Sequence, residues 1–551
     1  MRTLPRAAIG IAALLVVSWA APNADFVEVN SEPRSQTPFL TQVPHDGKRI
    51  LIVGAGTAGI AALKAIMVDL PEETRRGWEV VVAEQRSGAG GVWLADNVTH
   101  PEPPELPDTP LYPQLVTNTP HPTMTIPHFP FRPETPLFPK HSLVQQYHAD
   151  ILAHFNLTHH VRFNTQVVET RWEKGRWLVS TQNRRSGATE LSNFDHLIVA
   201  TGCFHYPRAP IFEGRDEWLA ASENRSILHS VYFRDPSIFA GKNVLVVGSS
   251  ASGQDVAKHA SKYANSTTIA FKNVPYLDAD APPDIPGVNT KPRLSHFTPD
   301  AAVFDDNSRL SEIDAVVLAT GYELRVPFLT NGGVLPEYPK DRDTTSNALS
   351  TNLRYIRPLW RHVFALDPAL PPTALSFVGL PIFVANALDS VAQGLLIGHA
   401  IANPDILPSR ADMLEELRAR EEAARAAGLE PEYIGHRILA LPGEDPLAGM
   451  QYTESLVRYL QDHGLAGIGT VPPIGENFTD SWRIQCNRDT FLLRRTWKRV
   501  EAMGEDVVGE WVSGVESEED WVGMMDRLAE WGRQQEDEED VRGLSLRDYE
   551  Y

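Results

Sequence analysis

The sequence of 551 residues predicts an α/β fold with two parallel-sheet domains, the second inserted into the first, and a helical C-terminal extension. Two observations carry this prediction. A glycine-rich turn joins a buried strand to a helix twice, at 54–59 and at 248–253. A later apolar strand ends in Ala-Thr-Gly twice, at 200–202 and 319–321, so each turn has its own partner strand.

The first turn has the spacing G-x-G-x-x-G, and the residues that it places at the turn are Gly54, Ala55, Gly56, Ala58 and Gly59. Gly54 allows the tight turn, Gly56 lets the backbone approach a pyrophosphate, and Gly59 lets the helix pack closely on the strand. The helix N-terminus offers free N–H groups and a positive dipole end to phosphates. This pattern predicts a Rossmann-like dinucleotide-binding domain.

A second strand, residues 79–84, ends in the acid Glu84, which can bind a ribose hydroxyl. Glu84 lies about thirty residues after Gly54, and the polar insert 71–77 accounts for the extra length. The loop that follows contains Gly91, Val92 and Trp93. The Trp93 ring either walls a flat ring system or anchors the loop in the core.

The second turn places Gly248, Ser249, Ser250, Ser252 and Gly253 after an apolar strand. Because Ser250 replaces the middle glycine, this fingerprint is degenerate. The next strand ends in Lys272 rather than an acid. A cation there favours the 2′-phosphate of NADP, and the alternative is a solvated lysine at a strand end.

Between these units, the segment 101–140 is too rich in proline for a helix or a regular central strand, and its aromatic residues indicate a packed loop. A helix is expected over 142–155, and strands over 161–163, 165–168 and 177–181. A return strand at 375–381 and a helix near 390–402 complete the first domain.

From Ser409 the chain is predicted to be helical. Ser409 and Asp412 form an N-cap pattern, and five tryptophans (Trp482, Trp497, Trp511, Trp521 and Trp531) are interpreted as packing residues.

The formal net charge of −21 argues against a nucleic-acid surface and against binding to anionic membranes. Cys203 and Cys486 are the only cysteines, so no C-x-x-C motif exists. The sequence is compatible both with a disulfide between them and with two free thiols. No metal-ligand spacing, H-E-x-x-H motif or G-x-S-x-G elbow is found, so we expect no metal. The acids at 536–540 predict a solvated tail.

The N-terminus predicts a secretory address. Arg2 and Arg6 precede a short apolar run (7–19), and Ser18-Trp19-Ala20 fits a cleavage site, so residues 1–20 read as a signal peptide and 21–46 as a linker. We therefore expect a secreted protein with no stable membrane span, the alternative being an uncleaved anchor in the endoplasmic reticulum. Five N-x-S/T triplets are glycosylation acceptors on that route: Asn97, Asn156, Asn224, Asn265 and Asn477.

These motifs in this order resemble the flavin-containing monooxygenase family, especially its fungal members. Besides both turns, the marks are Gly90-Gly91-Val92-Trp93, Thr117-Asn118 and Leu318–Tyr322. The family motif F-x-G-x-x-x-H-x-x-x-Y/F is matched in two halves, by Phe212–Gly214 and by His229 with Phe233, around an insertion at 215–228. The resemblance covers roughly residues 48–402.

The resemblance implies FAD on the first unit and NADPH on the second. It implies that one oxygen atom of O2 enters a soft nucleophile, the nitrogen of a small amine or the sulfur of a thiol or thioether, by way of a C4a-hydroperoxyflavin. It places the boundaries at 47–206 and 329–405 for the FAD-binding domain, 207–328 for the NADP-binding domain and 406–551 for the helical region. A homodimer is compatible with this scheme.

The resemblance also assigns roles to residues. Asn118 would face the flavin, and His229 and Phe233 would couple NADP to the flavin; the alternatives are a turn residue and ordinary loop packing. The implied cofactor contacts, beyond the residues of the two turns, are Glu84, Gly91, Val92, Trp93, Thr117, Val167, Thr201, Gly202, Lys272, Ala319, Thr320, Gly321, Tyr322 and Gln393.

Four alternatives are weighed. A Baeyer–Villiger monooxygenase acting on ketones usually carries Trp where Phe233 stands. A flavin disulfide reductase needs a cysteine pair that this chain lacks. A secreted NADPH oxidase that releases hydrogen peroxide would suit a compartment where NADPH is scarce. A nucleotide-binding protein without turnover is the fourth.

Overall fold

The computed structural model describes residues 47–272, 285–338, 347–445 and 447–541. The predicted signal peptide (1–20) and linker (21–46) lie outside the described residues, and so does the end of the acidic tail. Among the described residues, no helix combines the length and the apolar character needed to cross a bilayer. Both cysteines are free thiols, so the structure contains no disulfide between Cys203 and Cys486.

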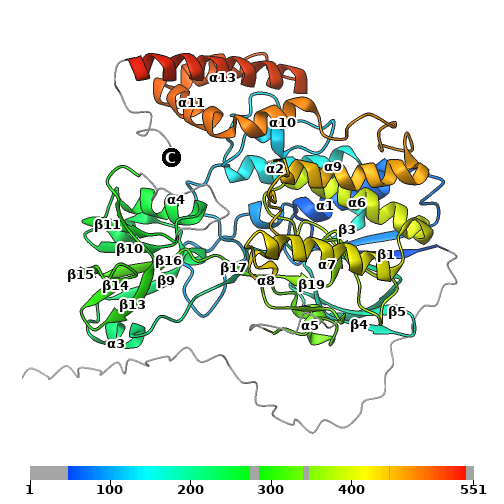
Figure 1. Ribbon diagram of the computed structural model, residues 1–551, viewed down its shortest axis with the longest axis horizontal. Coiled ribbons are helices and arrows are strands. Elements are labelled where there is room, and N and C mark those ends of the chain that lie inside the picture. The colour runs from blue at the N-terminus through cyan, green and yellow to red at the C-terminus, as the bar shows by residue number, and fades with distance from the viewer. Residues whose placement is uncertain (1–46, 273–284, 339–346, 446, 542–551) are drawn as a thin grey trace, which may run out of the picture. The chain divides into compact units, whose positions relative to one another are not determined.

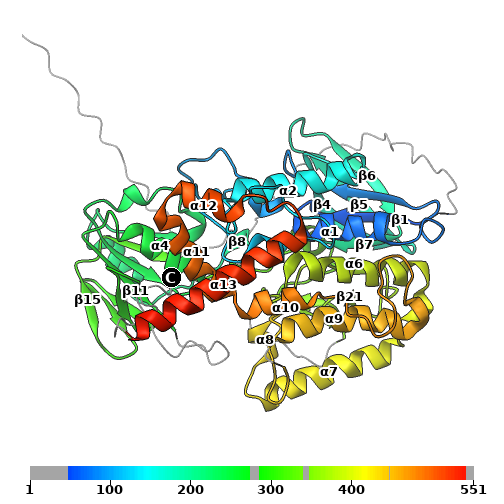
Figure 2. The ribbon, with the colours of Figure 1, turned by 90° about the horizontal axis from the view of Figure 1, so that it is seen from above.

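The first sheet has seven strands, and chain segments on both sides of the second domain build it (Figure 1). Its central strands β1, β2, β7 and β22 run parallel, with Val53 beside both Ala83 and Val199. Helices α1 (Thr57–Lys64) and α6 (Asn386–Ala402) lie side by side on it (Figures 1 and 2). In sheet order the strands are β20 (Leu359–Trp360), β21 (Phe364–Ala365), β22 (Leu375–Phe377), β7 (His196–Val199), β1 (Arg49–Val53), β2 (Glu79–Ala83) and β3 (Val161–Arg162).

The second sheet is wholly parallel and carries helix α4 (Ala251–Ala260). Because all its strands lie between β7 and β20 in sequence, the second domain is inserted in the first, and the predicted fold class is confirmed. The chain crosses between the domains where β8 (Tyr206–Pro207) pairs with β17 (Tyr322–Glu323). In sheet order the strands are β12 (Asn289–Lys291), β11 (Ser266–Ala270), β10 (Asn243–Val247), β16 (Ala315–Leu318) and β9 (Ser226–His229).

Two antiparallel sheets of three strands accompany the parallel ones. In the first, β4 (Thr165–Glu173) and β5 (Arg176–Asn183) extend the predicted strands by several residues, and β6 (Thr189–Phe194) was not predicted. The second, β13 (Leu294–Thr298), β14 (Ala301–Phe304) and β15 (Arg309–Ser311), was not predicted. It covers the insertion at 215–228, where Trp218 of α3 (Arg215–Ala220) is fully buried against Phe297.

The proline-rich segment is a packed loop, as predicted. It contains one short 3-10 turn (η3, His121–Met124) and a single bridge between Val116 and Lys140. Helix α2 (His141–His154) follows it at the expected place. Several of its apolar side chains are buried, among them Leu111, Tyr112, Phe131, Leu137 and Phe138.

The C-terminal region is helical, and Ser409 caps α7 as predicted, because its hydroxyl accepts the Asp412 N–H. Trp497 and Trp521 are buried in one cluster with Leu137 and Phe138 of the proline-rich loop. Helices α11 and α13 lie side by side (Figures 1 and 2). The helices are α7 (Arg410–Ala426), α8 (Pro431–Ile434), α9 (Ala448–Leu460), α10 (Ser481–Arg488), α11 (Thr490–Met503), α12 (Glu505–Val512) and α13 (Glu518–Val541).

Candidate active site

The first glycine turn lies at the carboxyl end of β1 and requires its glycines. Gly54 has φ +107°, and a Cβ there would lie 2.6 Å from the Ala200 carbonyl oxygen. A Cβ on Gly59 would lie 1.8 Å from the Gly54 carbonyl oxygen, because α1 packs directly on the turn. The N–H groups of the first helical turn, from Thr57 on, are left for a ligand, as at any helix N-terminus.

A second loop covers this turn. The Gly90 N–H donates to the Ala55 carbonyl at 2.9 Å, and a Cβ on Gly91 would meet the Gly56 Cα at 2.8 Å. The buried Arg86 guanidinium donates to the Gly91 carbonyl at 2.9 Å and to those of Leu94 and Ala95, which fixes the loop that carries Val92 and Trp93. The Trp93 ring is only partly buried.

Glu84 directly follows β2, and its side chain reaches the turn. Its carboxylate accepts the N–H groups of Ala55 and Arg86, both at 2.7 Å, and its side chain is buried. Burial raises the pKa of Glu84, and the two backbone donors oppose that rise. A carboxylate has about four lone-pair positions, so two remain for ribose hydroxyls.

The second turn repeats the geometry of the first. Gly248 has φ +110°, and its Cβ would lie 2.4 Å from the Ala319 carbonyl oxygen, while a Cβ on Gly253 would lie 1.9 Å from the Gly248 carbonyl oxygen. Ser250 holds the place of Gly56 at φ −74°, where any residue fits, and its side chain is exposed. Ser249 and Ser252 lie on either side of Ser250. Because the two glycines and the backbone angle of Ser250 match the first turn, the second turn keeps the same backbone conformation although its middle glycine is replaced.

The Ala319–Tyr322 turn lies beside the second glycine turn and is fixed from two sides. Arg208 donates to the Thr320 carbonyl at 2.8 Å, and the Thr320 hydroxyl donates back to the Arg208 carbonyl at 2.5 Å. His229 accepts the Val231 N–H at Nδ1, so its Nε2 carries the proton and donates to the Gly321 carbonyl at 3.0 Å. Burial lowers the pKa of His229 to about 4, and the ring stays neutral.

The structure shows the packing of two residues that the resemblance places in the coupling of NADP to the flavin. Both ring nitrogens of His229 are engaged with backbone, so His229 is a positioning residue for Gly321. Phe233 is fully buried in the core of the second domain, against Tyr112 (ring centroids 5.1 Å apart) and Phe239. The family motif marks a structural junction at these positions.

Asn118 lies at the junction of the two domains. On one side, Tyr112 is buried in the core of the second domain and its hydroxyl donates to Asp255 of α4. On the other side, Thr117 donates its N–H to the Pro139 carbonyl at 3.0 Å, directly before α2 of the first domain. The Asn118 side chain is exposed, and within the described parts of the chain no hydrogen bond engages its amide.

The remaining predicted contacts divide into two groups. Thr201 and Gly202 are exposed at the carboxyl end of β7, whereas Val167 is a core residue of β4. Gln393 is fully buried, and both ends of its amide are occupied, by the Gly379 N–H at 2.9 Å and the Tyr452 hydroxyl at 3.0 Å. Gln393 thus fixes Gly379, where a Cβ would lie 2.7 Å from the Ala58 Cβ, and its predicted place at the flavin stays a prediction.

Two further residues support the site and were not predicted. His148 of α2 donates from Nδ1 to the Val144 carbonyl and accepts the Thr57 hydroxyl at 2.8 Å, which fixes the first residue of α1. Arg234 is buried and donates to the Val231 and Phe233 carbonyls at 2.9 Å and to the Thr109 carbonyl at 2.7 Å. No local pattern marks either residue, because the partners are distant in sequence or are backbone groups.

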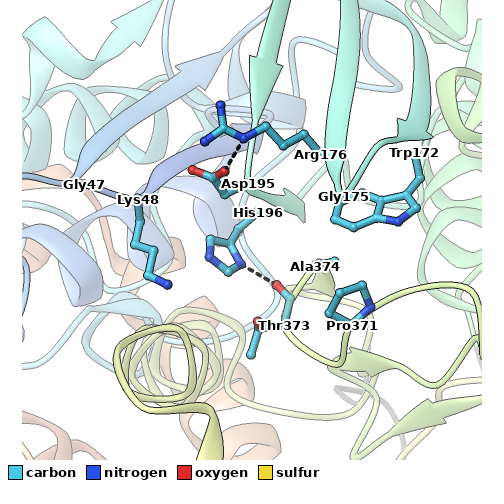
Figure 3. Close-up of a pocket in the computed structure, with 10 residues that line it drawn as sticks. All are labelled: Gly47, Lys48, Trp172, Gly175, Arg176, Asp195, His196, Pro371, Thr373 and Ala374. Carbon is cyan, nitrogen blue, oxygen red and sulfur yellow. Dashed lines mark hydrogen bonds and ion pairs between the residues drawn. The ribbon is translucent and has the colours of Figure 1, made fainter. Parts of the chain in front are cut away.

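A pocket of about 350 Å³ lies at the opposite edge of the first sheet (Figure 3). Lys48 and His196 line it at the amino ends of β1 and β7, and His196 binds the Thr373 carbonyl at 2.8 Å. Ligands of open α/β sheets bind at the carboxyl ends of the strands. This pocket is therefore not the candidate site.

The two turns fit two dinucleotides. The first combines a glycine cradle that a Cβ would fill, a helix N-terminus and a buried acid next to the ribose position, which suits the ADP part of FAD. The second combines the same cradle with the exposed cation Lys272, which suits NADP.

Comparison with known proteins identifies the class. The family model "Flavin-binding monooxygenase-like" matches residues 47–277 and 274–430, so the chain belongs to that family. The enzyme is a flavin-dependent monooxygenase, an oxidoreductase with FAD and NADPH as cofactors. The predicted family, activity and cofactors are confirmed.

Particular relatives are distant. The chain is 27% identical over 409 residues to Flavin-containing monooxygenase FMO GS-OX-like 2 of Arabidopsis thaliana, covering 71% of this chain and 81% of the relative. S-allyl-L-cysteine S-oxygenase from Allium sativum has the same fold (TM-score 0.65, 22% identity, 89% of this chain and 98% of that chain). So does Tmm from Pelagibacter sp. strain HTCC7211 (TM-score 0.59, 24% identity, 82% and 90%).

Proposed function

We propose that the enzyme oxygenates the sulfur atom of a small thioether or thiol, with Asn118 at the reacting centre. The observation that supports this role is the place of Asn118, exposed at the junction of the two dinucleotide-binding domains. The redox chemistry and the activation of O2 belong to FAD and NADPH when they are bound. The chain's own residues bind, orient and exclude water.

We assign the orienting role to the Asn118 amide, whose N–H2 group donates hydrogen bonds and whose oxygen accepts them. Tyr112 and Thr117 hold the Asn118 backbone between the two domains. The loop that ends in Trp93 covers the first glycine turn and keeps water from it. His229 fixes the Gly321 turn, so the nicotinamide side of the site has a rigid wall.

The second domain binds NADPH rather than NADH in this proposal, because Lys272 is exposed at the end of β11, where the 2′-phosphate of NADP lies in such domains. Glu84 takes the corresponding place in the first domain, and its negative charge suits a free ribose hydroxyl. The acid after β2 therefore favours FAD, and the cation after β11 favours NADPH.

The test is a product assay with the FAD-loaded protein, NADPH and isotope-labelled O2. S-allyl-L-cysteine is the first substrate, because the Allium sativum protein of the same fold oxygenates it; a tertiary amine and a cyclic ketone are run in parallel. We expect one labelled oxygen atom on sulfur. Oxygen on nitrogen alone, or an ester from the ketone, would refute the sulfur assignment, and hydrogen peroxide equal to the NADPH consumed would favour the oxidase.

We also propose that the chain enters the secretory pathway and is glycosylated. The N-terminal pattern supports this, and so does the exposure of all five acceptor asparagines in the structure: Asn97, Asn156, Asn224, Asn265 and Asn477. Expression with the native N-terminus in a fungal host tests it. Secreted protein that loses mass on enzymatic deglycosylation supports the proposal, and unmodified protein in the cytosol refutes it. The homodimer stays a prediction, which the mass in solution tests.

A further inference from the structure

Three cationic side chains gather around Tyr433 of α8, and a fourth lies near one of them. The Lys272 ammonium lies 3.3 Å from the Tyr433 hydroxyl, and the Arg354 guanidinium lies 4.6 Å from the centre of the Tyr433 ring. Arg208 interacts electrostatically with Tyr433, and Arg437 interacts electrostatically with Arg208. Lys272 comes from the second domain, whereas Arg354 and Tyr433 come from segments that follow it in sequence.

The arginines of this cluster have no acidic partner within ion-pair distance in the described part of the chain. Among the described residues, none of Arg208, Arg354 and Arg437 forms an ion pair. The nearby acids are committed elsewhere, because Glu323 pairs with Arg325 and Glu432 pairs with Arg425. Arg354 and Arg437 both repel the charge of Arg208.

The cluster is out of keeping with the rest of the chain, whose formal net charge is −21. Burial and the repulsion of Arg354 and Arg437 lower the pKa of Arg208 to about 10. Lys272 and Arg354 lower the pKa of Tyr433 although its burial acts in the opposite direction. The Tyr433 hydroxyl therefore occupies a position where the surrounding cations would favour an anion.

We propose that Arg354 is a ligand of the 2′-phosphate of NADPH and grips it from the side opposite to Lys272. The inference rests on the proposed binding of NADPH to the second domain. A phosphate carries more charge than the phenol and accepts two parallel bonds from a guanidinium, so it displaces the Tyr433 hydroxyl from Lys272. The selectivity of the enzyme for NADPH over NADH then depends on Arg354, which lies outside the second domain.

The proposal has a consequence for the two domains. Lys272 moves with the second domain and Arg354 with the rest of the chain, so a phosphate between them closes a bond across the domain junction. The half-buried Arg208, beside the crossing strands β8 and β17, contributes long-range charge to the same place. NADPH therefore fixes the angle between the domains, and NADH does not.

The experiment titrates FAD-loaded enzyme with 2′,5′-ADP and with 5′-AMP, by calorimetry, in wild type and in Arg354→Ala. We expect Arg354→Ala to weaken 2′,5′-ADP at least tenfold and to change 5′-AMP less than twofold. The matched control is Arg185→Ala, which removes one exposed cation from the turn between β5 and β6 and should leave both ligands unchanged. If Arg354→Ala folds poorly, Arg354→Lys keeps the charge without the fork, and we expect a loss of about threefold.

Unchanged 2′,5′-ADP affinity in the Arg354 variant, together with a clear loss in Lys272→Ala, overturns the inference and leaves the proposed function intact. An equal loss of 2′,5′-ADP and 5′-AMP also overturns it. Anaerobic reduction of the bound flavin by NADPH separates the two proposals. If NADPH fails to reduce the wild-type flavin while 2′,5′-ADP still depends on Arg354, the anion site stands and the proposed function falls.

Discussion

Replacement of Asp389 by Asn should stabilise the enzyme at alkaline pH and leave it unchanged near pH 4. Asp389 lies in the first turn of α6 with no exposed surface; the Thr453 hydroxyl donates to Oδ1 at 3.0 Å, and Oδ2 has no partner among the described residues. Burial raises the pKa of Asp389 to about 7, from 3.8 for an exposed carboxyl. The folded state therefore holds a proton that the unfolded state loses first.

The size and sign of the effect follow from this difference. Between about pH 4 and pH 7 the native state binds more protons than the unfolded state, so the free energy of unfolding falls as the pH rises through that window. Three pKa units correspond to about 4 kcal/mol above pH 7, and the helix N-terminus offsets up to about 2 kcal/mol. Asn keeps the acceptor for Thr453 and carries no charge, so Asp389→Asn should recover about 2 to 4 kcal/mol at pH 8.

The assay is the thermal midpoint of the FAD-loaded enzyme at pH 4.5 and at pH 8. We expect Asp389→Asn to raise the midpoint by several degrees at pH 8 and by less than one degree at pH 4.5. Asp405→Asn, an exposed acid just beyond the other end of α6, is the control and should not change the difference. An equal gain at both pH values would show that the gain does not come from ionisation, and a loss at pH 8 would show that the native state stabilises the ionised carboxylate; either result refutes the reasoning.

Three further predictions concern the site. Gly54→Ala places a Cβ 2.6 Å from the Ala200 carbonyl oxygen at φ +107°, so the purified protein should lose most of its flavin absorbance; Gly443→Ala, at φ +89° with open space around it, should stay yellow. Asn118→Ala should keep FAD but release hydrogen peroxide in place of product, and unchanged coupling of NADPH use to oxygenation would remove Asn118 from the mechanism. Lys272→Ala should raise the Michaelis constant at least tenfold for NADPH and less than twofold for NADH, and equal effects would contradict its contact with the 2′-phosphate.

The sequence predicts both glycine turns and the inserted topology because these depend on local spacing. Gly54, Gly59, Gly248 and Gly253 each stand where a Cβ would strike backbone a few residues away or on the neighbouring strand. A fixed spacing of glycines after an apolar strand is visible without any knowledge of distant contacts. The sheet β13–β15 was missed, because its strands are short and lack clear alternation.

The roles of His229, Phe233 and Gln393 could not be predicted in the same way. A motif marks a position, but the direction of a side chain depends on what packs around it. Phe233 meets Tyr112, and Gln393 meets Tyr452, more than fifty residues away in either case. For the same reason the role of His148 could not be predicted, because its contact with Thr57 depends on how α2 packs on the first domain.

Among the residues that the structure describes, the loop that covers the first glycine turn has no counterpart over the second. Gly90 and Gly91 lie against Ala55 and Gly56, whereas Ser250, at the matching place in the second turn, is exposed. A ligand beneath a covering loop dissociates only after the loop opens, whereas a ligand on an exposed turn dissociates directly. The two dinucleotides should therefore differ more in residence time than in their contacts. We expect FAD to remain bound to the protein during gel filtration and NADP+ to exchange within each turnover. Two domains of the same fold would then hold a prosthetic group and an exchangeable cosubstrate.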